Sequence, residues 1–147
     1  MLPFTLIDQA DTAGALEKLG PARDLDVLVL YYGELARRAF LGKILGAAGY
    51  TDPGTQLHLL EWPADQDLDL STLVRSLNVN KVMLFGYTLP RLGLHLEVAN
   101  YFPLTVAGTT YLIADSLDFI EDAKAGGDNR AAGALWTAVK GAFLKIS

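Results

Sequence analysis

The sequence predicts a single-domain α/β protein, a three-layer α/β/α sandwich around a mostly parallel sheet of about four strands. Two predicted strands, 26–31 and 81–85, are apolar at successive positions after their first, charged residue, as expected of strands that are covered on both faces. Segments with helical apolar spacing alternate with these runs, and right-handed crossovers place such helices on both faces of a parallel sheet. We expect the run at 81–85 to form the central strand.

The composition is that of a folded domain rich in apolar residues. The chain has 147 residues, of which 51% are hydrophobic, and its mean hydropathy is +0.26. This length is enough to bury a core in one domain, over residues 1–147, and the composition argues against disorder. The longest apolar run, 27–32, is far shorter than the ~20 residues of a membrane helix. The apolar excess therefore belongs in a core or in a partner interface.

Charge and residue types exclude several functional classes. The chain has no cysteine, which excludes disulfides, thiolate zinc sites, iron–sulfur clusters and cysteine nucleophiles. His58 and His95 are far apart, with no carboxylate at ligand spacing, so we expect no metal and no cofactor. The net charge of −5 does not favour direct nucleic-acid binding, which usually requires a basic face. Without thiol chemistry or a signal-peptide pattern, we expect a cytoplasmic protein with no membrane contact.

The first third of the chain combines a short helix, a buried strand and a long amphipathic helix. Asp11 fits the N-cap of a short helix that Gly20-Pro21 ends. The strand 26–31 follows. A helix over 34–48 is then predicted by apolar residues at i, i+3, i+4 and i+7, and Gly49 ends it. This apolar stripe consists of Leu41, Ile44, Leu45 and Ala48.

Turn residues and a further helix separate the next strands. Asp52-Pro53-Gly54 has the chemistry of a turn and leads to a strand at 56–61, which Trp62-Pro63 ends. The acidic segment 64–69 leads into a helix over 71–77, whose positive N-terminus favours nearby carboxylates. The buried face of this helix is predicted to be Leu70, Leu73, Val74 and Leu77.

The segment after the central strand is predicted to be mostly extended. Residues 92–98 alternate between apolar and other residues, which is the period of a strand, although a helical turn is also compatible with them. Residues 101–106 are typical of an irregular or edge strand, because Pro103 cannot donate to a ladder. Gly108 marks a turn, and the β-branched and aromatic residues of 109–114 predict a further strand.

Two helices are predicted to complete the chain. Asp115 or Ser116 caps the first of them, which Gly126-Gly127 ends. Asp128 is predicted to cap the second. The apolar stripe of this last helix consists of Leu135, Trp136, Val139, Phe143 and Ile146.

Three stretches resemble the uracil-DNA glycosylase-like superfamily. VLVLYYGELARRAFLGKILGAAGY (27–50) resembles the strand, loop and long helix that open the core of these proteins. KVMLFGYTLPRLGL (81–94) resembles their later strand, and GTTYLIADSLDFIEDAKAGGDNRAAGALWTAVKGAF (108–143) resembles their C-terminal end. The resemblance implies the three-layer fold of that superfamily. It also implies a degenerate member, similar to the psi subunit of the bacterial DNA polymerase III clamp loader, which has this fold without glycosylase activity.

The catalytic motifs of the glycosylases are largely missing. Gly33-Glu34 match the start of the water-activating motif "GEAPG", but Leu35-Ala36-Arg37 do not match the rest. The "HPS" motif falls on Ala114-Asp115-Ser116, where only the serine is kept. Base excision requires a flipped base to be held by stacking and hydrogen bonds. The resemblance therefore implies no catalysis, with Glu34 as a vestigial candidate or simply a first-turn helix residue.

These inferences lead to a non-catalytic protein-interaction domain as the expected function, in its most concrete form a psi-like accessory subunit of the replicative clamp loader. One alternative is a divergent DNA glycosylase that uses Glu34 to hydrolyse an N-glycosidic bond. Another is a protein that binds a small molecule at the strand ends near Gly33, Gly86 and Asp115. The aromatic residues considered are either interface anchors or partly buried rim residues, namely Trp62, Tyr87, Tyr101 and Phe102. Ser116 is either a nucleophile or a helix cap. The expected partner or ligand surface comprises Tyr32, Gly33, Glu34, Trp62, Tyr87, Arg91, Asp115 and Ser116.

Overall fold

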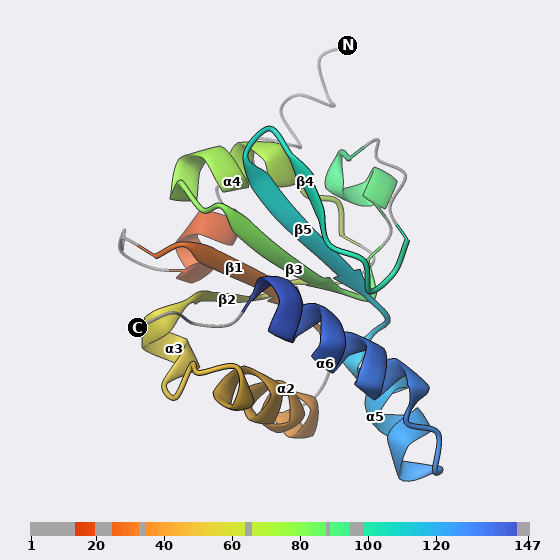
Figure 1. Cartoon of the computed structure of the whole chain (residues 1–147). Helices are drawn as coiled ribbons and strands as arrows, with labels where there is room; N and C mark the ends of the chain where they lie inside the picture. The colour runs from red at the N-terminus through yellow and green to blue at the C-terminus, as the bar shows by residue number, and fades with distance from the viewer. Residues whose placement is uncertain are drawn as a thin grey trace.

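The computed structural model describes residues 14–19, 25–32, 35–63, 66–87, 89–94 and 99–143. These residues form an α/β structure with a five-stranded sheet in the order β2-β1-β3-β5-β4 (Figure 1). A helical segment at 14–19 precedes the labelled elements. The labelled elements are β1 (Val27–Tyr31), α2 (Leu35–Ala47), α3 (Pro53–Gln56), β2 (His58–Glu61), α4 (Leu70–Leu77), β3 (Lys81–Phe85), the 3₁₀ helix η1 (Leu89–Leu92), β4 (Leu104–Val106), β5 (Thr109–Ala114), α5 (Leu117–Ala125) and α6 (Arg130–Ala142).

The sheet has four parallel strands and one antiparallel edge strand. β1 pairs in parallel with β2 and β3, and β3 pairs in parallel with β5. β4 pairs antiparallel with β5, so the sheet has five strands where about four were expected. The additional strand comes from a tight hairpin. Ala107 and Gly108 have φ values of 52° and 84°, which suits a two-residue hairpin turn, and the sequence correctly predicted an edge strand here.

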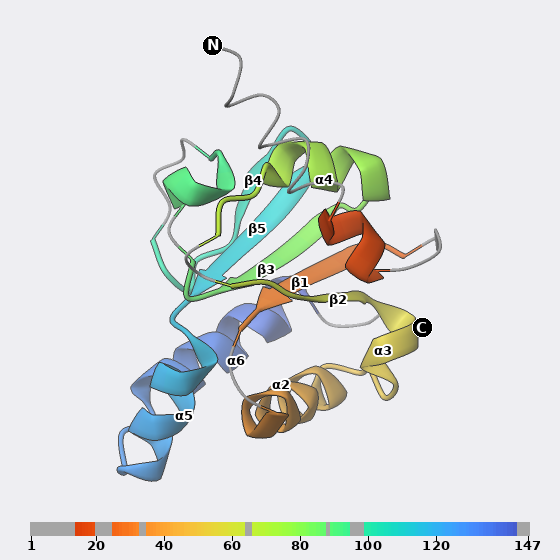
Figure 2. The same cartoon turned by 180° about the vertical axis from the view of Figure 1, so that it is seen from behind.

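Helices cover both faces of the sheet, as the sequence predicted. α2, α5 and α6 lie on one face, whereas α4 lies on the other with the segment 14–19 (Figures 1 and 2). Strand residues alternate between the two layers: Val29 and Met83 pack with the first group of helices, and Leu28 and Leu84 with the second. This alternation explains why the central strands are apolar at successive positions. No helix within these described ranges is long and apolar enough to span a bilayer.

Three local predictions differ from the structure. The turn predicted at 52–54 continues into the one-turn helix α3, because the fixed φ of Pro53 suits the first helical position. The extended segment predicted at 92–98 begins in the 3₁₀ helix η1, and 95–98, with His95, lie outside the described residues. The N-cap of α6 is Asn129 rather than Asp128.

The capping carboxylate of α6 still comes from Asp128, one residue earlier than the N-cap position. Its Oδ1 accepts a hydrogen bond from the Arg130 backbone N–H at 3.1 Å, and Oδ2 lies 2.8 Å from the Arg130 guanidinium. The side-chain and backbone hydrogen bonds from Arg130 lower the pKa of Asp128 to about 2. Ser116 caps α5 as predicted, because its Oγ accepts from the Phe119 N–H at 3.1 Å.

Candidate functional site

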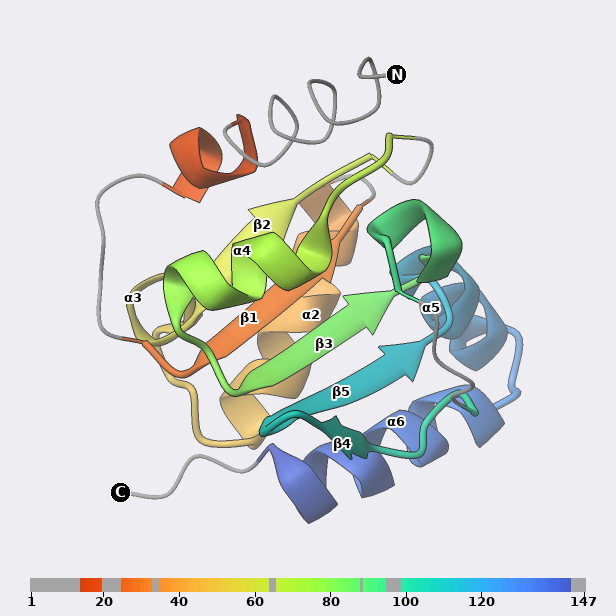
Figure 3. The ribbon, with the colours of Figure 1, turned by 90° about the horizontal axis from the view of Figure 1, so that it is seen from above.

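The strand order places a topological switch point between β1 and β3. The connection from β1 runs through α2 to β2 on one side, and the connection through α4 then crosses to β3 on the other side. Open α/β sheets bind ligands in the crevice outside the carboxyl ends of the strands at such a point. Figure 3 shows the arrowheads of β3 and β5 at one edge of the sheet, where Gly86 and Asp115 follow these strands.

A crevice of about 400 Å³ lies at this edge. It brings together four of the site residues expected from the sequence, namely Tyr32, Tyr87, Asp115 and Ser116. The remaining lining residues are Gly86, Asn100, Ile113, Ala114 and Phe119. Gly33 and Glu34, the two residues that match the start of the glycosylase motif, lie outside the described residues. The geometry of the crevice is therefore that of the ends of β1, β3 and β5 and of the start of α5.

Gly86 allows the end of β3 to approach the start of α5 closely. Its φ is +82°, and a Cβ at this position would lie 2.7 Å from Ser116 Cβ and 2.8 Å from Ser116 Cα. The Gly86 N–H donates to the Ala114 carbonyl at 2.8 Å, and the Tyr32 hydroxyl donates to the Gly86 carbonyl at 3.1 Å. Only glycine combines this φ with this separation at low cost. Gly86 thus allows β3 and the start of α5 to line the crevice side by side.

Asp115 is held by two side chains that precede β4. The Tyr101 hydroxyl donates to Asp115 Oδ2 at 2.5 Å, and the Asn100 amide lies 3.5 Å from Oδ1. Burial, followed by the hydrogen bond to Asp115, raises the pKa of Tyr101, so this hydroxyl stays protonated and donates. Tyr101 has a φ of +69°, which is uncommon for a residue other than glycine, and its N–H donates to the Ile113 carbonyl at 2.8 Å. The backbone therefore holds Tyr101 against Asp115.

Tyr32 and Tyr87 form an aromatic pair on one side of the crevice. Their ring centroids are 5.4 Å apart with an interplanar angle of 84°, an edge-to-face arrangement. Tyr87 is only 8% exposed, and its hydroxyl donates to the Trp62 carbonyl at 2.7 Å. Trp62 is 2% exposed and donates its indole N–H to the Gln66 carbonyl at 3.0 Å. Trp62 therefore belongs to the core rather than to a contact surface, because a loop carbonyl satisfies its polar atom.

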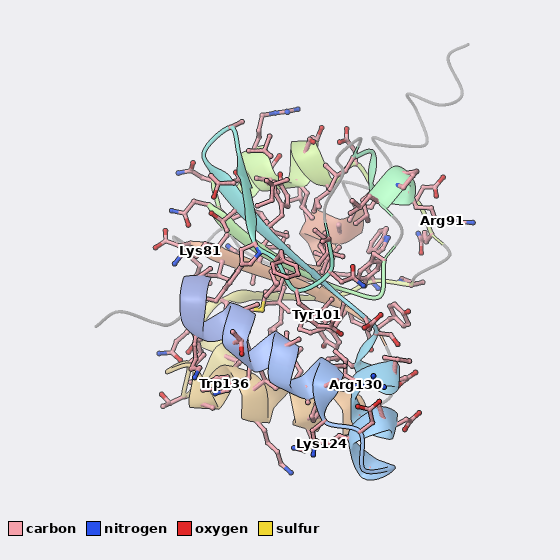
Figure 4. All side chains as sticks on the ribbon, turned by 45° about the vertical axis from the view of Figure 1, so that its right-hand side comes forward. Lys81, Arg91, Tyr101, Lys124, Arg130 and Trp136 are labelled. Carbon is pink, nitrogen blue, oxygen red and sulfur yellow. The ribbon has the colours of Figure 1, made fainter. Side chains whose placement is uncertain are left out.

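Arg91 lies outside the crevice. It is exposed in η1 and forms an ion pair with Asp67 at 3.3 Å, with both side chains at least half exposed (Figure 4). Exposed pairs of this kind contribute little to stability. Arg91 is therefore a surface residue that the structure does not bring to the other expected site residues.

The stability of the protein is expected to fall as the pH rises above about 10, the ordinary tyrosine pKa. Burial is the largest cause that raises the pKa of both Tyr87 and Tyr101 in the folded chain. Their contribution is fully present below the unfolded pKa and is lost as the pH rises towards the folded value, because the unfolded state releases these protons first. Urea unfolding between pH 8 and pH 11.5 measures the effect. Burial also raises the pKa of Tyr50 and Tyr111. Tyr87→Phe removes one of these tyrosine hydroxyls, and its free energy of unfolding should depend less steeply on pH; an equal slope would contradict this assignment.

Asn100 and Phe119 line the crevice but were not identified from the sequence. Tyr101 was considered from the sequence as an interface anchor, but its hydrogen bond to Asp115 was not predicted. Tyr101 meets Asp115 across 14 residues of chain, and the contact depends on a φ that tyrosine rarely adopts. Phe119 was identifiable in principle, because the cap bond from its N–H to Ser116 brings it to the start of α5. Among the residues that the structure describes, no three His, Asp or Glu side chains lie together in a way that could hold a metal.

A second concave surface lies on the helical layer formed by α2, α5 and α6. This groove has a volume of about 500 Å³. It is lined by Phe40, Lys43, Ile44, Ala47, Glu121, Lys124, Ala125, Ala132, Leu135 and Trp136. The sequence placed Ile44, Leu135 and Trp136 in core-facing stripes, and the structure leaves Ile44 and Trp136 only partly buried.

Comparison with family models and with curated sequences finds no relative of the chain. No protein-family model matches the chain, and no curated protein matches its sequence. The uracil-DNA glycosylase-like resemblance therefore rests on the three stretches 27–50, 81–94 and 108–143.

Proposed function

We propose that this chain is a non-catalytic protein-interaction domain with a uracil-DNA glycosylase-like fold, and that it acts as a psi-like accessory subunit of the bacterial replicative clamp loader. One observation carries the proposal: the polar side chains of the crevice form hydrogen bonds with other groups of the same chain. Asp115 accepts from Tyr101 and lies within reach of Asn100, Ser116 caps α5, and the Tyr32 hydroxyl donates to a backbone carbonyl.

These bonds weigh against hydrolysis in the crevice. A general base must reach the water that it activates, and a serine nucleophile needs an adjacent base. At Asp115, a water would compete with the Tyr101 hydroxyl for Oδ2. Ser116 Oγ already accepts the Phe119 N–H, and neither histidine nor lysine is among the described lining residues. The crevice therefore serves as a structural junction between β3, β5 and α5.

The groove on the other layer supports the interaction role. It presents apolar side chains from three helices, including the large rings of Phe40 and Trp136. Tryptophan is enriched among the residues that contribute most to protein interfaces. The high apolar content of the chain, 51%, accordingly appears at a surface as well as in the core.

Binding to purified clamp-loader subunits tests the proposal directly. We expect the full chain to bind an immobilised clamp-loader subunit, measured by biolayer interferometry and by co-elution in size-exclusion chromatography. An unrelated acidic protein of similar size serves as the control. Binding to no clamp-loader, polymerase or single-strand-binding component would contradict the clamp-loader form of the proposal.

The crevice at the switch point favours a second candidate function, the binding of a small molecule. Its volume of about 400 Å³ falls within the ~300–1,000 Å³ of ligand pockets, and Phe119, 55% exposed, offers a ring beside it. A ligand bound there should shift the amide NMR signals of Gly86 and Asn100. If members of a fragment library shift only signals from other parts of the chain, this candidate fails.

A further inference from the structure

The groove between α2, α5 and α6 has an apolar floor and partly exposed walls. Leu135 and Phe40, which are 1% and 8% exposed, are the most buried of its described lining residues. Ile44 and Trp136 pack against the same core cluster but remain partly accessible. Figure 4 shows Trp136 on α6 and Lys124 on α5 on this side of the molecule. An apolar segment that lay in the groove would therefore extend an existing core layer.

Two of the three charged residues in the described lining of the groove are basic, although the chain as a whole has a net charge of −5. Lys43 of α2 and Lys124 of α5 line the groove, and Glu121 is the acidic residue among the described lining residues. Lys140 lies next to Trp136 of the groove, with its Nζ 5.7 Å from the centroid of the Trp136 ring. A partner that carries carboxylates beside an apolar stripe would match this distribution, because complementary charge steers association and determines orientation.

The helical walls also restrict the backbone of the partner. The lining residues come from helices, whose backbone groups are already paired within each helix. An extended peptide would find no strand edge to pair with, and its backbone would lose hydrogen bonds on burial. A helix satisfies its own backbone and presents side chains at i, i+3, i+4 and i+7 to an apolar groove.

We propose that this groove binds an amphipathic helix of a partner protein, whose apolar stripe is flanked by Asp and Glu side chains. This inference rests on the proposed interaction function and names its surface and its partner class. A second copy of the chain fits less well, because a two-fold interface would bring together two grooves that each have more lysine than glutamate in their described lining. Repulsion between these like charges opposes that arrangement.

Two synthetic peptides provide the probes. Each is a fluorescein-labelled helix former with leucines at i, i+3, i+4 and i+7; one has glutamates along both sides of the stripe, and the other has lysines there. Fluorescence anisotropy should show that the glutamate peptide binds the full chain about tenfold more tightly than the lysine peptide. Trp136 emission should change on binding, because the other tryptophan, Trp62, is buried on the opposite layer.

Lys124→Glu and Arg75→Glu form a matched pair of charge reversals. Both residues are exposed basic residues in the last turn of a helix, but Lys124 lines the groove, whereas Arg75 lies on α4 across the sheet. Lys124→Glu should lower the affinity for the glutamate peptide about three- to tenfold and raise the affinity for the lysine peptide. Arg75→Glu should change neither affinity. Circular dichroism establishes that both variants fold.

Three results would overturn the assignment of the groove: equal binding of the two peptides, no binding of either, or the same effect from both substitutions. A concentration-dependent dimer in sedimentation velocity that Lys124→Glu disrupts would assign the groove to a second copy and contradict the proposal. The interaction function is tested separately. If clamp-loader subunits bind the wild-type and Lys124→Glu chains equally, the chain remains an interaction domain but uses another surface.

Discussion

Replacement of Gly86 by alanine is expected to lower the free energy of unfolding by about 2–5 kcal/mol. Two costs add. The φ of +82° is unfavourable for alanine, and the added Cβ would lie 2.8 Å from Ser116 Cα, a backbone atom that cannot rotate away. Relief requires a shift of the start of α5, where Ser116 is the N-cap. Urea unfolding followed by circular dichroism measures the loss.

Gly133→Ala is the control for this substitution. Gly133 lies inside α6, and a Cβ there would meet nothing within 4 Å. Alanine is favoured over glycine in a helix interior, so we expect this variant to be more stable than the wild type by about 0.5–1 kcal/mol. A Gly86→Ala chain as stable as the wild type would contradict the close approach of β3 to α5.

Replacement of Phe85 by alanine is expected to cost about 3–5 kcal/mol, as large-to-small substitutions in a core do. Phe85 is 1% exposed and belongs to the core cluster that β3 shares with α2, α5 and α6. The cost combines the lost burial of the ring with the cavity that remains. Thermal and urea unfolding of the wild type and the variant measure it.

Phe119→Ala is the matched control, because this ring is 55% exposed beside the crevice. Its expected effect is within about 0.5 kcal/mol, as for most surface substitutions. Equal losses for the two phenylalanines would show that β3 does not hold Phe85 in the core.

The central part of the fold was predictable because burial on two faces leaves a clear pattern. β1 and β3 each alternate between the two helical layers, as Val29 and Leu28 show for β1, so every position except Lys81 at the start of β3 is apolar. The N-cap at Ser116 and the helix end at Gly49, whose φ is 104°, were also predictable, because the residue types favoured at helix ends are known. These features depend on short stretches of sequence, where the physical cause and the residue lie together.

The segment after β3 was not predictable from its alternation. Leu92 and Leu94 are both buried, but Leu92 ends η1, and the chain turns at Gly93 with a φ of +71°. The Leu94 N–H donates to the Leu89 carbonyl at 3.0 Å, which closes this turn. The alternation of apolar and other residues at 92–94 therefore comes from a turn that buries two leucines on either side of Gly93, and it does not indicate a strand.

The candidate site was predictable only in part, because its contacts join distant segments. The loops after β1, β3 and β5 were expected to meet at one edge, and Tyr32, Gly86 and Asp115 do so. The contact between Tyr101 and Asp115 depends on a positive φ that tyrosine does not signal. The groove was not identified either, since an apolar stripe does not reveal how much of its width the neighbouring helices cover.

Uracil release from DNA tests the central claim of a non-catalytic interaction domain most directly. Single- and double-stranded oligonucleotides that contain one uracil are incubated with the wild-type chain and with Glu34→Gln, and abasic-site cleavage is followed on denaturing gels. An active uracil-DNA glycosylase shows that the substrate is competent. We expect both chains to release no more base than a protein-free blank. Release by the wild type that Glu34→Gln abolishes would contradict the account and identify the chain as a glycosylase.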